Sequence, residues 1–280
     1  MPTLFAWAVP AQFGGSPVDH TWVTDFDSRI VSYPSIQNVI AASANYWFCW
    51  GNYHPKGGTP QLPNGFLGAQ FASIGMATCL VAPNLPCLAN PPARGTIIRY
   101  GIDGVCHQLA NQVLWATNAN PGVPLTVHLA RGYAFSTFLF GTYGRQHAAW
   151  LTKIHSCSNT VQATPTQGTS EQTMAAFADD EFERRAREVL NGPEASERLQ
   201  RLLDLRRATL RTGEGMRSRV QNDMVAPSAA ELNAHYNEVL RQAASILTFA
   251  EYRELFGFEP GEVVNLVDPE MVASSSGGAS

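Results

Sequence analysis

A cysteine stands directly behind a glycine-rich turn and at the start of a helix-forming segment. The run YGIDGVCHQLANQVLW begins at Tyr100, passes through Gly101 and Gly104, and predicts a helix over Val105 to Thr117. Cys106 would lie in its first turn, where unpaired backbone N–H groups and the positive end of the helix dipole favour a thiolate. The same N–H groups could stabilise the oxyanion formed when that thiolate attacks an acyl carbon. Cys106 is therefore predicted to be an ionised nucleophile.

A cysteine nucleophile needs a base, and His20 is the leading candidate among seven histidines. The segment DHTWVTDF around it is rich in β-branched and aromatic residues and predicts a strand over Thr21 to Phe26. Alternation along a strand places His20 and Trp22 on one face and Thr21 and Val23 on the other. His20 would then project at the edge of the sheet.

The order of these residues resembles one enzyme superfamily. A strand-borne histidine early in the chain, followed by a cysteine at the start of a helix, is similar to the circularly permuted papain-like branch of the NlpC/P60 superfamily, which includes lecithin:retinol acyltransferase-like proteins. In ordinary papain-like enzymes the cysteine precedes the histidine. The resemblance covers at most residues 1–150. It implies an α+β fold with an antiparallel sheet and a cysteine-bearing helix, His20 as base, Cys106 as nucleophile, and His54 as the orienting third member.

These residues predict a cysteine-dependent hydrolase or acyltransferase, such as an amidase, peptidase or transacylase. Cys106 would attack an amide, ester or thioester of a small molecule or peptide, His20 would take and later return the proton, and water or an amine would resolve the thioester. Aromatic residues around these segments favour an aromatic-walled pocket. The residues expected to contact the substrate are Trp22, Trp50, Tyr143 and His107, the last of which could instead be a packing residue.

Two other interpretations stay open. One pairs Cys106 with a downstream histidine, His128 or His147, in the Cys-then-His order of transglutaminase-like enzymes. The other is a non-catalytic binding or assembly protein whose charged helices contact partners. The chain shows no paired Cys/His spacing typical of structural zinc and no GxGxxG or P-loop motif, so neither metal nor cofactor is predicted.

Composition divides the chain in two. Residues 1–165 contain no Glu, only four Asp and seven Lys or Arg, and all six Trp, whereas the remainder carries 19 acidic and 12 basic residues. This shift predicts a catalytic α/β domain over 1–160, a polar linker over 161–170, an all-α region over 171–270 and a flexible tail over 271–280.

Local signals predict the individual elements of both parts. In the first part, strands are expected over Thr96 to Tyr100 and Tyr133 to Phe140, and Asp103 is the expected N-cap of the cysteine-bearing helix. In the second part, helices are expected over Glu171 to Leu190, over Glu194 to about Thr212 with an end near Gly213 and Gly215, over Ser228 to Leu247, and over Thr248 to Phe256.

Charge and cysteine usage exclude several classes of protein. A net charge of -4 and the lack of a Lys/Arg-rich run argue against a nucleic-acid partner. No signal peptide or segment long enough to cross a bilayer is expected. The five cysteines are odd in number and irregularly spaced, which is typical of a reducing compartment, so we expect a cytoplasmic protein. A homo-oligomer formed through the helical region stays open.

Overall fold

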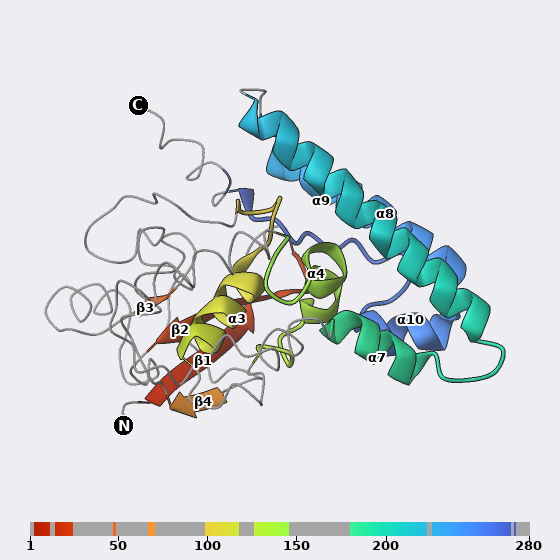
Figure 1. Cartoon of the computed structure of the whole chain (residues 1–280), viewed down its shortest axis with the longest axis horizontal. Helices are drawn as coiled ribbons and strands as arrows, with labels where there is room; N and C mark the ends of the chain where they lie inside the picture. The colour runs from red at the N-terminus through yellow and green to blue at the C-terminus, as the bar shows by residue number, and fades with distance from the viewer. Residues whose placement is uncertain are drawn as a thin grey trace, which may run out of the picture.

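The computed structural model combines an antiparallel sheet with a set of helices, in line with the expected α+β class (Figure 1). It describes residues 3–11, 15–24, 47–48, 67–70, 99–117, 126–145, 180–222, 226–269 and 272. The predicted linker over 161–170 lies outside them, as does most of the predicted tail.

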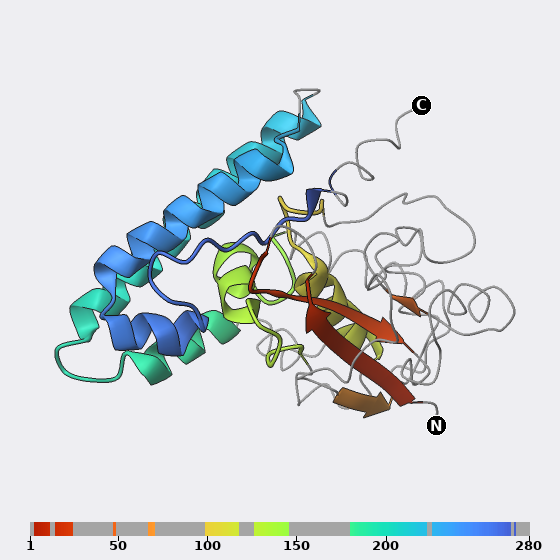
Figure 2. The same cartoon turned by 180° about the vertical axis from the view of Figure 1, so that it is seen from behind.

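The sheet has the strand order β3-β2-β1-β4, and every neighbouring pair is antiparallel. The strands are β1 (Thr3–Pro10), β2 (Asp19–Thr24), β3 (Trp47–Phe48) and β4 (Leu67–Gln70). The strand predicted over 21–26 is confirmed up to Thr24 and begins two residues earlier than expected. Figure 2 shows β1 and β2 running side by side in opposite directions.

Small side chains on one face of the sheet leave room for a helix. Ala8 pairs with Thr21 and Ala6 pairs with Val23, so these four residues share a face. The helix α3 (Cys106–Thr117) packs against β2 and β1, and its apolar residues belong to the same buried cluster as Ala6, Ala8 and Val23. The helix predicted over 105–117 is thus confirmed, with Cys106 as its first residue.

The segment predicted as a strand over Tyr133 to Phe140 is instead the helix α4 (Tyr133–Phe140), so that prediction was wrong. Every residue of α4 except Ala134 is buried. A helix buried on all sides has no polar face, so its apolar run cannot be told from a buried strand by periodicity. Gly132 and Gly141, both at positive φ, bound the helix. The strand predicted over 96–100 is described only at its last two residues, where Tyr100 opens a turn.

In the described part of the chain four further helices follow α4, and three of them, α7, α8 and α10, contact it. They are α7 (Glu181–Val189), α8 (Ser196–Gln221), α9 (Ala229–Ile246) and α10 (Phe249–Phe256). The helices predicted over 228–247 and 248–256 are confirmed, because Ser228 with Glu231 and Thr248 with Glu251 both form complete capping boxes. The helix predicted over 171–190 is confirmed from Glu181 onward, but it was wrong as one continuous helix, because the extended backbone of Asp180 caps α7 and begins it there. Residues 171–179 lie outside the described part.

The predicted end of α8 near Gly213 was wrong, because the helix continues through Gly213 and Gly215 to Gln221. Glycine is needed at 213 for a tertiary reason. A Cβ atom there would lie 1.2 Å from Nη1 of Arg145, whose guanidinium group rests against the helix backbone. Gly213 therefore admits a side chain from a distant segment and does not end the helix.

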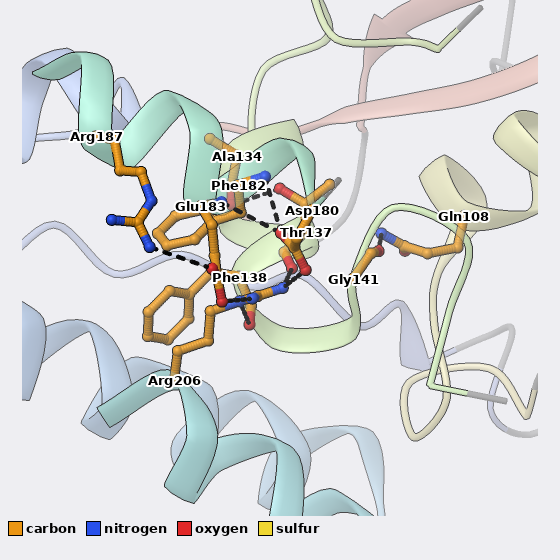
Figure 3. Close-up of polar contacts among 10 residues, drawn as sticks. All are labelled: Gln108, Ala134, Thr137, Phe138, Gly141, Asp180, Phe182, Glu183, Arg187 and Arg206. Carbon is orange, nitrogen blue, oxygen red and sulfur yellow. Dashed lines mark hydrogen bonds and ion pairs between the residues drawn. The ribbon is translucent and has the colours of Figure 1, made fainter. Parts of the chain in front are cut away.

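A buried arginine joins α4, α7 and α8 (Figure 3). Arg206 is 4% exposed and reaches from α8 to the carbonyl oxygens of Thr137 and Phe138, at 3.3 Å each. Its guanidinium group also pairs with the carboxylates of Asp180, the N-cap of α7, and Glu183. One cation thus pairs with the acidic start of α7 and donates hydrogen bonds to carbonyl oxygens at the end of α4.

The helices beyond residue 180 share a core with the first half of the chain. A single cluster of buried apolar residues runs from Ala6 in β1 to Val267 after α10. Helices α7 and α8 both contact α4. Within the described ranges, no helix has the length and apolar character needed to cross a membrane.

Candidate functional site

Cys106 begins α3, and the cap of this helix differs from the expected one. The N–H group of Val105, the residue before the helix, donates to Oε1 of Gln108 at 3.0 Å. Asp103, the expected N-cap, instead accepts the N–H group of Arg99 at 3.1 Å. The turn at residues 101–103 directs the Asp103 carboxylate back toward Arg99, so this carboxylate does not cap α3.

The sulfur of Cys106 lies against the backbone of β2. Its Sγ atom is 4.0 Å from the carbonyl oxygen of Asp19, and Thr21 contributes hydrogen bonds that act on the thiol pKa. Asp19 and Thr21 are the residues on either side of His20. The fold therefore brings the helix-start cysteine to the strand position that carries the candidate base.

The prediction that Cys106 is ionised at neutral pH was wrong. The side chain is buried, at 6% exposure, and burial raises the pKa of the thiol to about 11, while hydrogen bonds from Thr21 and the His107 amide lower it only in part. At pH 7 roughly one molecule in ten thousand would carry a thiolate. Loss of solvation outweighs the helix dipole at this position.

His20 is buried in β2 and stacks on Trp22, with 5.7 Å between ring centroids and 21° between ring planes. The predicted alternation of the strand is therefore confirmed for these two residues. Because successive side chains point to opposite faces, the imidazole of His20 lies on the face opposite the Thr21 side chain. The fold brings the Cys106 sulfur to the β2 backbone next to His20 but turns the His20 ring toward Trp22.

The imidazole ring of His107 contacts the same backbone carbonyl, that of Asp19, as the Cys106 sulfur. It is fully buried, with Nε2 3.1 Å from the carbonyl oxygen of Asp19 and Nδ1 2.9 Å from Oγ of Ser136. Burial lowers its pKa to about 4, so the ring is neutral near pH 7. A carbonyl oxygen only accepts, so Nε2 carries the proton. These contacts favour packing over substrate contact as the role of His107.

Amide side chains on α3 hold the segment after α4, a role that the sequence interpretation missed. Gln108 donates to the carbonyl oxygen of Gly141 at 3.2 Å (Figure 3). Asn111 and Gln112 donate to the carbonyl oxygens of Thr142 and Tyr143, at 2.8 Å each. Their spacing of three to four residues puts them on one helix face, and that spacing is the sequence signal that could have revealed them.

A cleft of about 770 Å³ lies between the 126–134 segment, α7 and the end of α10. Tyr143 and His128 line it, the former buried and the latter exposed. On its wall the hydroxyl of Tyr133 donates to Oε2 of Glu181 at 2.7 Å. His107 packs against the Tyr133 ring at 5.9 Å between centroids, so this cleft and the Cys106 region share a wall.

Several candidate residues lie outside the part of the chain that the structure describes. They are His54, Trp50 and His147, together with the other four cysteines. Among the residues that are described, no group of three or more His, Cys, Asp or Glu side chains could hold a metal ion.

Comparison with known proteins returns no relative for this chain. No protein-family model matches it, and no curated protein or solved structure is significantly similar to it.

Proposed function

We propose that this protein is a cysteine-dependent hydrolase or acyltransferase in which Cys106 is the nucleophile and His20 the base. The observation that supports it is the position of the Cys106 sulfur, at the first residue of α3 and 4.0 Å from the β2 backbone beside His20. An antiparallel sheet that carries a cysteine-bearing helix also fits the papain-like arrangement that the residue order suggests.

The Cys106 thiol is protonated at the start of the proposed reaction, so proton removal accompanies the attack. Because the pKa of Cys106 is about 11, a base must take the proton as the sulfur attacks. His107 is poorly suited to that task, since its pKa is about 4 and both ring nitrogens are already engaged. His20 lies on the opposite face of β2 from the sulfur, so β2 itself would have to shift for the His20 ring to reach the thiol.

The reaction then proceeds through a thioester. The S–C bond forms as the proton moves to His20, and the amine, alcohol or thiol of the substrate leaves with that proton. Water or an amine next attacks the thioester, and the Cys106 sulfur takes a proton back. The N–H groups of the first turn of α3 are the donors nearest to the developing oxyanion.

Intact-mass spectrometry with a panel of amides, esters and thioesters tests the proposal. We expect an acyl adduct on the wild type, none on Cys106→Ala, and loss of adduct formation in His20→Asn. His128→Asn and His147→Asn are the matched variants for the transglutaminase-like order. Adduct formation that survives in His20→Asn but not in one of these two would assign the base to that other histidine.

A non-catalytic binding or assembly protein is the second candidate, and the burial and high pKa of the Cys106 thiol favour it. In that case Cys106 is a small core residue. Cys106→Ala would then fold with near wild-type stability, and neither protein would form an adduct with any member of the panel.

A further inference from the structure

Three arginines lie around Asp103, a buried residue in the turn before α3. Asp103 is 1% exposed, and it accepts the backbone N–H of Arg99 through Oδ2 at 3.1 Å. The N–H group of Arg145 donates to the Asp103 carbonyl oxygen at 2.8 Å. Nη1 of Arg217, from α8, lies 3.9 Å from Oδ1 of Asp103. This arginine cluster therefore joins the first half of the chain to the C-terminal helices.

The guanidinium group of Arg145 is fixed in one place. Its Nη1 donates to the carbonyl oxygens of Thr209 and Leu210, at 3.0 Å each. Its central carbon lies 5.2 Å from the centroid of the Phe140 ring, and the missing side chain of Gly213 leaves the space that Nη1 occupies. The orientation of the remaining donors is thus set by the fold.

Those remaining donors are buried and unused. Nε and Nη2 of Arg145 and Nη1 of Arg99 are shielded from solvent and have no hydrogen-bond partner. Nε and Nη2 form the edge of a guanidinium group that matches two oxygens of a carboxylate or phosphate. A charged donor that is buried without a partner destabilises the protein, because it has lost its hydrogen bonds to water. A ligand that supplies oxygen acceptors would remove that cost.

The charges around Arg145 favour an anion. Arg99, Arg145 and Arg217 face the carboxylates of Asp103 and Glu214, which leaves an excess of positive charge. We propose that the arginine cluster binds a small oxyanion, a carboxylate or a phosphate, through the Nε–Nη2 edge of Arg145 and Nη1 of Arg99. This site is separate from the Cys106 thiol and does not depend on the proposed function.

Isothermal titration calorimetry of the full chain with inorganic phosphate and with acetate tests this site. We expect saturable binding to the wild type, and the tighter of the two anions identifies the ligand as a phosphate or a carboxylate. Arg145→Lys keeps the positive charge but removes the paired Nε and Nη2 donors, and it should bind the anion about tenfold more weakly. Arg211→Gln removes an exposed arginine from α8, the helix that carries Arg217, and is the matched control.

If Arg145→Lys fails to fold, anion binding to Arg99→Gln and to the wild type still tests the site. Arg99→Gln, at a side chain with one unused donor, should fold and also bind the anion more weakly. No saturable binding of either anion to the wild type would overturn the proposal, as would equal affinity in Arg99→Gln and the wild type.

Discussion

Replacement of Arg206 by methionine should destabilise the protein strongly. Methionine keeps much of the length and apolar character of the side chain but removes the guanidinium group. The carbonyl oxygen of Phe138 then loses this hydrogen bond, whereas that of Thr137 keeps the N–H group of Gly141. Breaking a buried ion pair by removing one partner costs about 3–5 kcal/mol.

Partial exposure of the acidic partners reduces that figure. The carboxylates of Asp180 and Glu183 are 28% and 37% exposed, so water can solvate them when the arginine is absent. We therefore expect a loss near the lower end, about 3 kcal/mol in the free energy of unfolding. Urea unfolding followed by circular dichroism measures this loss. An unchanged slope of the unfolding free energy against urea concentration would show that both proteins expose the same surface when they unfold.

Two companion variants separate the causes. Arg184→Met breaks the exposed pair with Glu188, whose side chains are 52% and 58% exposed, and should cost less than about 1 kcal/mol. Asp180→Asn removes the charge next to Arg206 but keeps an N-cap for α7, because asparagine caps as well as aspartate. Equal losses for Arg206→Met and Arg184→Met would refute the assignment of Arg206 as the junction of three helices.

Three other perturbations test separate parts of the structure. Gly213→Ala should displace the Arg145 guanidinium group and lower the melting temperature, whereas Gly215→Ala, where a Cβ atom meets nothing within 4 Å, should not lower it. Alkylation of Cys106 by iodoacetamide should be slow at pH 7 and should rise with pH toward about 11; a plateau below pH 8 would contradict the burial argument. The lowered pKa of His107 means that its contribution to stability is present above pH 6.5 and is lost as pH falls toward about 4. His107→Gln should flatten that part of the acid-unfolding curve, and an unchanged curve would show that other groups cause it.

The helices that the sequence predicted best are those whose ends are set by local chemistry. Both α9 and α10 begin with a Ser or Thr followed three residues later by Glu, and these pairs form the capping boxes that the pattern indicates. Gly257 ends α10 in the left-handed conformation, with φ of 75°. Signals of this kind act within one turn and need no knowledge of the rest of the fold.

The elements that were predicted wrongly depend on distant contacts. Helix α4 needs no polar face because α3, α7, α8 and α10, from both halves of the chain, all pack against it. Gly213 continues a helix because Arg145, 68 positions earlier, needs the space. Neither fact is written in the residues near the element itself, since both arise when segments far apart in sequence pack together.

The same distinction between local and distant causes applies to Cys106. Glycines and helix formers around it correctly predicted that it begins a helix, and a charge at a helix N-terminus gains about 0.3–1 kcal/mol. The rise of its pKa from 9.0 to about 11 corresponds to about 3 kcal/mol against ionisation, so burial decides the state of the thiol. Any catalysis by Cys106 must then depend on a base that acts during the attack. Its rate should consequently follow the protonation of an imidazole and not that of the sulfur.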